Sequence, residues 1–293
     1  MPDALKRDLR ARGSITTDLA EVVAIARGSS QNIYNGNASD IAATVSAFLG
    51  KYARFILYAR RFEVQPISAE EVQAVCTHGN KSAAGMDSWE PAEIALLSPA
   101  LFAKMALLFN LIEAGAQWPD GANHARAAYL AKDPDKADDP LGYRVLLILS
   151  VVYRVYGTVR LHAMQGWADQ WSLLEMYAGA GLQGAEDAWY EVATDFERWD
   201  VEGAEYMGGT IDIAKCFDQI VRALIYRLLA LAGMPARILD TYRRYQEALI
   251  IHNTIAGGIG RGFSRRCGIP QGCPLSMMIM ALLMRPWVVM IKA

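Results

Sequence analysis

Two short segments in the last third of the chain hold the residues best suited to chemistry. The first segment centres on Asp212, near the end of an apolar run, Tyr206–Ile213, that we expect to form a short strand. A carboxylate at the end of a strand projects from a fixed backbone, and rigid oxygen ligands of this kind suit a magnesium ion. An aspartate after a strand is also commonly the N-cap of the next helix, so both interpretations stay open here.

The second segment is the turn Gly268–Gly272, which leads into an apolar helix. Its two glycines let the backbone approach a ligand closely, and Pro270 stiffens the turn. Gln271 offers both a donor and an acceptor from that fixed backbone. The composition therefore favours a turn that faces a ligand, although an ordinary strand–turn–helix connection would explain the glycines and the proline equally well.

Taken together and in this order, Asp212–Asp218 and Gly268–Ser276 resemble the palm of reverse transcriptases of the non-LTR (LINE-type) retrotransposon family. In that family an aromatic ring five residues after the aspartate packs beneath the sugar of the nucleotide, and Phe217 stands at that position. The resemblance further implies that Gln271 and Gly272 contact the template and the incoming nucleotide. From the residues alone, Phe217 could equally be the first core residue of its helix.

Looser matches to the same family lie upstream. Lys81-x-x-x-Gly85-x-Asp87 resembles the opening block of its reverse-transcriptase domain, and Trp118-Pro119 follows in the family's order. Lys132 and Arg144 then match the positions that hold the triphosphate of the incoming nucleotide. The planar fork of an arginine bonds phosphate oxygens in pairs, which suits this role.

The chain departs from the family pattern after that arginine, where the family usually has proline and Val145 stands here. This difference concerns the local backbone more than the charge. Without the resemblance, Lys132 and Arg144 would be read as solvated charges at strand ends. Asp218 is expected to cap its helix or to pair with Arg222, four residues later, rather than to bind a metal.

The resemblance implies RNA-directed DNA synthesis from a DNA primer on an RNA template, with deoxynucleoside triphosphates as substrates. Two Mg²⁺ ions activate the attacking hydroxyl and steady the leaving pyrophosphate. Asp212 and the backbone of Ile213 would supply metal ligands. The family keeps its remaining carboxylates in an aromatic-x-Asp-Asp motif, which does not follow the turn in this sequence. One carboxylate would have to hold two divalent ions against their mutual repulsion, so we expect this chain to be inactive by itself.

Two other functions stay open at this point: a non-catalytic nucleic-acid-binding remnant, and a helical scaffold in which the motifs no longer act. The uneven distribution of charge along the chain bears on the nucleic-acid-binding function. Residues 215–293 contain 11 basic and 3 acidic residues, whereas the preceding residues contain 18 basic and 28 acidic ones. A polyphosphate would be drawn to the C-terminal third. The arginines there, such as Arg222, Arg227, Arg243 and Arg244, could instead simply line the solvated faces of helices.

Composition excludes several classes of protein. With 293 residues, 53% of them apolar and 20% charged, the chain is expected to fold around a substantial core. Its four cysteines lack zinc spacing and are expected to be free thiols. No signal peptide is expected, because Met1–Arg12 is charged and has no apolar run behind it. No membrane partner is expected, because the apolar stretch Leu275–Ile291 is interrupted by Arg285-Pro286. Residence inside the cell, nuclear or cytoplasmic, follows only from the family resemblance.

The expected fold class is α+β: helix-rich fingers plus a partial palm of a right-hand polymerase, with an incomplete palm sheet and no thumb. We expect an N-terminal helical extension over residues 1–80, a fingers-like region over 81–205 and a partial palm over 206–293. Gly28–Ala38 is expected to be a loop. The patterns predict helices over these ranges: Asp40–Phe62, a short helix from Ser68, Pro91–Leu97, Pro99–Ala114, Val151–Gln165, Glu186–Trp199, Phe217–Ala232, Ala236–Leu249 and one from Pro274. Further strands are expected over these ranges: Arg126–Lys132, Arg144–Leu149, Ile250–Ile255 and Arg261–Cys267.

Overall fold

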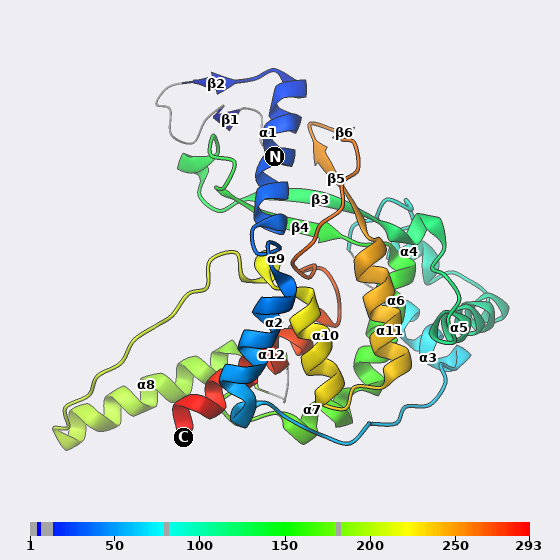
Figure 1. Cartoon of the computed structure of the whole chain (residues 1–293). Coiled ribbons are helices and arrows are strands. Elements are labelled where there is room, and N and C mark those ends of the chain that lie inside the picture. The colour runs from blue at the N-terminus through cyan, green and yellow to red at the C-terminus, as the bar shows by residue number, and fades with distance from the viewer. Residues whose placement is uncertain (1–4, 7–13, 79–81, 180–182) are drawn as a thin grey trace.

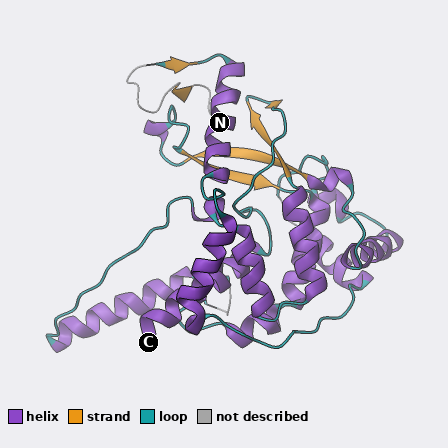
Figure 2. Ribbon diagram, viewed as in Figure 1, coloured by secondary structure: helices purple, strands orange, loops and turns teal. Residues whose placement is uncertain are grey.

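The protein is an α+β protein in which helices dominate, as expected (Figure 2). The computed structural model describes residues 5–6, 14–78, 82–179 and 183–293. The helices are α1 (Leu19–Asn35), α2 (Ile41–Tyr52), α3 (Ala69–Thr77), α4 (Pro91–Ile94), α5 (Pro99–Glu113), α6 (Val151–Ala163), α7 (Gln165–Trp171), α8 (Ala185–Glu202), α9 (Cys216–Gln219), α10 (Arg222–Leu231), α11 (Ala236–Ala248) and α12 (Ser276–Lys292). The strands are β1 (Leu5–Lys6), β2 (Ile15–Thr16), β3 (His124–Ala131), β4 (Tyr143–Ile148), β5 (Ile250–Ile255) and β6 (Gly258–Ile259).

A small mixed sheet with the strand order β4-β3-β5-β6 lies above α6, α10 and α12 in the view of Figure 1, and α1 passes beside it. β3 and β4 form an antiparallel hairpin, whose register runs from Arg126 opposite Ile148 to Ala131 opposite Tyr143. β5 joins β3 in parallel, although more than a hundred residues separate the two strands. Alternate residues of β3 are buried, so one face of the sheet packs on the core.

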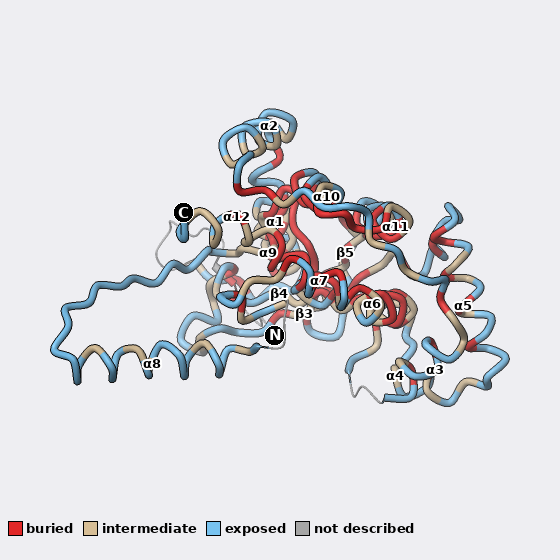
Figure 3. Tube along the Cα trace, turned by 90° about the horizontal axis from the view of Figure 1, so that it is seen from below, coloured by how far each residue is buried: buried red, intermediate tan, exposed pale blue. Residues whose placement is uncertain are grey.

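One main core joins the N-terminal, middle and C-terminal parts of the chain. Its centre is aromatic: Trp118 contacts Tyr156 edge to face with 5.2 Å between ring centroids, and Tyr153 stacks on Tyr245 with 3.4 Å between centroids. Such pairs add to the stabilisation that burial alone provides. Buried stretches of α6, α10, α11 and β5 lie in the middle of the molecule (Figure 3). The division into three regions stays a prediction, because the core is shared among all of them.

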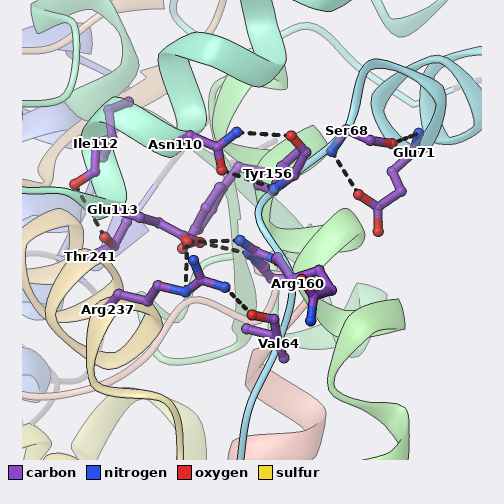
Figure 4. A network of polar contacts seen from close by, with 12 residues as sticks. Val64, Ser68, Glu71, Asn110, Ile112, Glu113, Tyr156, Arg160, Arg237 and Thr241 are labelled. Carbon is purple, nitrogen blue, oxygen red and sulfur yellow. Dashed lines mark hydrogen bonds and ion pairs between the residues drawn. The ribbon is translucent and has the colours of Figure 1, made fainter.

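A buried ion pair fixes α5 against α6 (Figure 4). Nε and Nη2 of Arg160 donate to the two carboxylate oxygens of Glu113, at 2.6 and 2.7 Å, and neither side chain is more than 2% exposed. The Tyr156 hydroxyl donates to the same carboxylate at 3.1 Å, and Arg237 of α11 approaches it to 3.4 Å. A charge pair out of water needs such additional partners to offset desolvation, so this network ties three helices to one point.

Several predicted elements are confirmed with their local causes. The short helix predicted from Ser68 is α3, and Ser68 and Glu71 form a capping box at its start. The predicted helices around Pro91 and Pro99 are present, each with the proline in its first turn. The strands β3, β4 and β5 match their predicted ranges closely. The apolar C-terminal stretch is the helix α12, which contains Pro286. Within the described part of the chain, no helix is long and apolar enough to cross a membrane.

Three predictions of local structure near the N-terminus and the sheet were wrong. The expected loop Gly28–Ala38 is mostly the second half of α1, because Asp18 caps a helix whose buried face continues to Tyr34. The helix expected over Asp40–Phe62 ends at Tyr52 and continues as a single 3-10 turn. The expected strand Arg261–Cys267 forms only one bridge, Ile251 to Phe263, and β6 pairs with β5 instead.

The helix predicted over Phe217–Ala232 is interrupted. α9 ends at Gln219, and α10 begins at Arg222. Between them Ile220 has an extended backbone, and its carbonyl oxygen accepts a hydrogen bond from the amide of Gly268 at 2.7 Å. A tertiary hydrogen bond therefore replaces a helical one. Gly233 closes α10 with a φ of +82°.

The strand predicted over Tyr206–Ile213 is absent, which matters most for function. All residues from Glu202 to Ala214 are exposed, and the segment has neither strand nor helix between Gly203 and Ile213. Gly208 and Gly209 lose more conformational entropy than other residues when they are fixed in a strand, and no strand of the sheet pairs with this segment. An unpaired strand is not stable alone, so the segment follows the end of α8 back to α9 as an extended connection (Figure 1).

Candidate functional site

The β3–β4 hairpin carries the two cations predicted to hold a triphosphate. The amide of Lys132 donates to the carbonyl oxygen of Gly142 at 2.9 Å and so closes the hairpin. Arg144 lies directly opposite Leu130 in the register. Both cationic side chains are exposed to solvent. Strand pairing therefore brings Lys132 and Arg144, which are 12 residues apart in the sequence, to the same end of one hairpin.

Lys215 connects the Asp212 segment to this hairpin. Its ammonium group donates to the carbonyl oxygen of Tyr143 at 2.9 Å, next to Arg144. Partial burial lowers the pKa of Lys215, and the positive charge of Lys132 lowers it further. Lys215 itself has a left-handed backbone, with a φ of +51°, and stands at the N-terminus of α9. Three cations, Lys132, Arg144 and Lys215, thus gather where the hairpin meets α9.

The residues after Lys215 are packed against the turn motif. The amide of Ile269 donates to the carbonyl oxygen of Phe217 at 2.8 Å. The Phe217 ring is half-buried and packs against the main core, so its role as a core residue is confirmed, while its predicted contact with a sugar stays a prediction. Gly268 has a φ of +83°, and a Cβ there would lie 2.6 Å from the carbonyl oxygen of Asp218. Only glycine allows this approach.

The other end of the turn motif rests on β4. A Cβ on Gly272 would lie 2.4 Å from the carbonyl oxygen of Leu147, so the glycine permits contact between two backbones. Gln271 is half-buried and Gly272 is exposed. Cys273 is buried, and its thiol lies 3.2 Å from the hydroxyl of Tyr153. The turn is thus held on both sides, by α9 and by β4.

The upstream motif reaches the same region through α6. Asp87 accepts hydrogen bonds from the Ser150 hydroxyl at 2.6 Å and from the amide of Val151 at 3.1 Å, where β4 gives way to α6. Asp87 therefore stabilises the junction that carries the hairpin. Lys81, the first residue of that motif, lies outside the described residues.

Asp212 is not part of this packed arrangement. Its side chain is exposed, and so is Ile213, at 48%. The Asp212 carboxylate contributes to a raised pKa of the Cys216 thiol, after burial of that thiol, which places it within electrostatic reach of α9. The expectation of a strand end that fixes this carboxylate was wrong, since the strand is missing.

The donor set around Asp212 does not fit a pair of magnesium ions. Magnesium requires near-octahedral oxygen ligands held in place, and two ions require several carboxylates. Asp212 lies on a segment without regular structure, and among the described residues no three His, Cys, Asp or Glu side chains cluster. The nearby Asp218 is buried, and burial raises the pKa of its carboxyl, which disfavours the charged form.

The sequence did not identify Lys215 or Asp218 as members of the site. Lys215 lies within the Asp212 motif, but its bond to a carbonyl oxygen of β4 depends on the fold. The expected pairing of Asp218 with Arg222 was wrong, because Arg222 is buried and donates instead to Glu247 at 2.7 and 2.9 Å. Asp218 faces the positive charges of Lys215, Arg265 and Lys132, which offset part of its desolvation.

Many of the basic residues in the C-terminal third are buried or bonded to other groups of the protein. Arg222 and Arg265 are buried, Arg237 pairs with Glu113, and Arg244 donates to backbone carbonyl oxygens near the end of α5. The idea that Arg222 lines a solvated helix face was therefore wrong, whereas Arg227 and Arg243 are exposed as it required. Attraction of a polyphosphate depends on local cations rather than on the summed charge of this region.

No protein-family model matches this chain, and no curated protein is significantly similar to it. The resemblance to non-LTR reverse transcriptases therefore stays a prediction that rests on the motif residues themselves.

Proposed function

We propose that this chain forms the fingers and the first part of the palm of an RNA-directed DNA polymerase, of the type found in non-LTR retroelements. One observation carries the proposal. Segments that resemble the family's motifs are far apart in the sequence, yet Asp87, Arg144, Phe217 and Gly272 belong to elements that touch one another around the β3–β4 hairpin. Unrelated chance matches would have no reason to pack together.

In this proposal the cations at the hairpin bind phosphate. Arg144 is exposed and can offer its planar fork to two phosphate oxygens, while Lys132 and Lys215 add positive charge from the two sides. Gln271 lies on a turn held at both ends and would present its amide to a template or nucleotide. A mixed group of one arginine and two lysines fits a triphosphate better than a neutral ligand.

We expect binding without synthesis from this chain. A single exposed carboxylate at Asp212 cannot position two metal ions. With Mg²⁺, deoxynucleoside triphosphates and a primed RNA template, the expected result is no extended primer. Template-dependent extension that is lost in Asp212→Ala would show that the chain is an active polymerase and that the expectation of inactivity is wrong.

A non-catalytic nucleic-acid-binding function is the second candidate, favoured by the exposure of Asp212 outside the packed motif segments. The two candidates differ in their dependence on a nucleotide. A polymerase-derived site predicts that the next complementary deoxynucleoside triphosphate tightens binding of a primed template, whereas a mismatched one does not. A purely nucleic-acid-binding protein predicts no effect of either nucleotide.

The test is fluorescence anisotropy of the full chain with a labelled DNA primer annealed to an RNA template. Lys132→Ala and Arg144→Ala should each weaken binding, and each should reduce the slope of log affinity against log salt by about 1. Arg198→Ala is the matched control, because this arginine is exposed on α8 and distant in sequence from the hairpin. It removes the same charge and should leave affinity unchanged.

Two outcomes contradict the proposal. No binding of primed template at about 0.15 M salt would favour the scaffold alternative, because phosphate contacts dominate nucleic-acid affinity. Equal losses in Arg198→Ala and Arg144→Ala would mean that any surface cation serves, so the hairpin would not be a site.

A further inference from the structure

Helix α8 contains none of the residues proposed for the nucleotide site. It runs for 18 residues, and none of them is buried. It stands away from the body of the protein, next to the extended segment that leads to α9 (Figures 1 and 3). Helices of this length in water depend on tertiary packing of an apolar face for most of their stability. A helix of this length without a buried residue therefore raises the question of what covers its apolar face.

One side of α8 is an aromatic stripe, which we define as Trp189, Val192, Phe196 and Trp199 with Tyr206 beyond the helix end. These helix positions follow 3–4 residue spacing and share one face. Trp189 is 74% exposed and Phe196 is 43% exposed. Tyr206 stacks on Trp199, with 5.2 Å between ring centroids, and so extends the stripe past the helix. Contiguous exposed aromatic surface of this kind marks an interaction site.

Carboxylates border the stripe. α8 carries seven acidic residues and one arginine. The arginine, Arg198, already pairs with Asp195 at 2.8 Å, and Asp187 caps the helix by accepting from the amide of Gly184. Within the described part of the chain, these carboxylates form no ion pair: Glu186, Glu197, Asp200 and Glu202.

We propose that α8 docks an amphipathic helix of a partner protein whose apolar stripe is bordered by Lys and Arg. The aromatic stripe supplies the buried apolar contact, and the unpaired carboxylates select the charge of the occupant. A nucleic acid or an anionic membrane would be repelled by the same carboxylates. Pairing of α8 with α8 of a second copy would place these carboxylates against one another, which disfavours self-association.

The probe is a synthetic helical peptide of about 18 residues made only of Leu and Lys, with Leu at i, i+3, i+4 and i+7. Its fluorescein anisotropy is measured against the full chain. A peptide with Glu in place of every Lys, and a Leu/Lys peptide of scrambled order, are the peptide controls. We expect saturable binding of the patterned Lys peptide alone, weakened by salt because surface charges are screened.

The protein variants test whether binding needs the aromatic stripe itself or any exposed aromatic residue of α8. Trp189→Ala and Phe196→Ala should each weaken binding of the Lys peptide at least about tenfold. Tyr190→Ala is the matched control, because Tyr190 is an aromatic residue of the same helix, 72% exposed, that lies outside the stripe. Glu197→Gln with Asp200→Asn should weaken binding and flatten its salt dependence. Circular dichroism checks that the variants keep the helix.

Four results would overturn the proposal. They are no binding of the patterned Lys peptide, equal binding of the Glu or scrambled peptide, equal losses in Tyr190→Ala and Phe196→Ala, or sedimentation showing that the chain self-associates through α8. None of these outcomes depends on nucleotide or primer binding, so the proposed polymerase function and the docking surface can fail separately.

Discussion

The Asp212 motif divides at Lys215 into two regions with opposite environments. In the packed region, Cys216–Ile220, every residue is buried or half-buried, and the carbonyl oxygens of Ile220 and Phe217 accept hydrogen bonds from the amides of Gly268 and Ile269. The exposed region, Gly203–Ile213, has no strand partner and no buried residue. The Asp212 motif, Asp212–Asp218, ends the exposed region and begins the packed one, and both regions contain apolar residues. Only the packed region has a packing partner, and this explains most of the difference.

The contrast shows what the candidate site has and what it lacks. Elements that would bind a nucleotide have neighbours to pack against and are held in place. The carboxylate that would bind metal lies in the region without neighbours. A polymerase needs both kinds of element in fixed positions, because catalysis depends on accurate placement of the reacting groups. This is the physical reason for expecting binding without synthesis.

The largest expected effect is a loss of stability when a buried ion pair is broken, compared with the loss when an exposed ion pair is broken. Glu113→Gln leaves Arg160 without its charged partner in the core and should reduce the free energy of unfolding by about 3–5 kcal/mol. Asp195→Asn breaks the Arg198 pair on α8, where the two side chains are 37% and 56% exposed, and should cost less than about 1 kcal/mol. Urea unfolding followed by circular dichroism measures both. Similar losses would mean that α8 is as tightly packed as the body.

A second comparison makes the same glycine-to-alanine substitution in the turn that packs on α9 and in the exposed region. Gly268→Ala places a methyl group 2.6 Å from the Asp218 carbonyl oxygen and requires a φ of +83°, so we expect a loss of about 2–4 kcal/mol. Gly208→Ala lies in the exposed region, where a Cβ would meet no atom within 4 Å. It should change stability by less than about 0.5 kcal/mol. A tolerated Gly268→Ala would show that the turn does not press on α9.

Sequence patterns predicted elements correctly wherever local signals and packing agree. The short helix at Ser68 and the strands β3 and β5 form where the sequence predicted them, with a capping box and alternate burial as the local causes. The patterns failed where a distant contact decides: Ile220 leaves its helix to accept the Gly268 amide, and Tyr206–Ile213 lacks a neighbouring strand.

For the candidate site, the motif residues on the hairpin and the turn lie in neighbouring elements of the fold, and their roles stay predictions. The sequence could not reveal that Lys215 bonds β4, because that contact joins segments 72 residues apart. The sequence also could not show that Arg222 is buried and forms an ion pair with Glu247. Local charge counts do not distinguish cations that face solvent from those that neutralise buried carboxylates.

The smallest expected effect tests whether the packed region is electrostatically strained. Burial raises the pKa of the Asp218 carboxyl, with partial relief from Lys215, Arg265 and Lys132. The folded protein then holds this proton more tightly than the unfolded chain does. Above the ordinary aspartate pKa of about 3.9, its contribution to stability should decrease with rising pH until the raised pKa is passed.

Asp218→Asn removes that titration while keeping the shape of the side chain. The variant should therefore gain stability relative to the unaltered protein as the pH rises from about 4 to 7, by less than the loss expected for Gly268→Ala. Unfolding free energies across this range measure the difference, and Asp212→Asn in the exposed region is the control, with a change below about 0.5 kcal/mol. If Asp218→Asn instead loses stability as the pH rises, the ionised carboxylate stabilises the fold. The three cations around it would then outweigh its desolvation, and α9 would be held to the hairpin by charge rather than by packing.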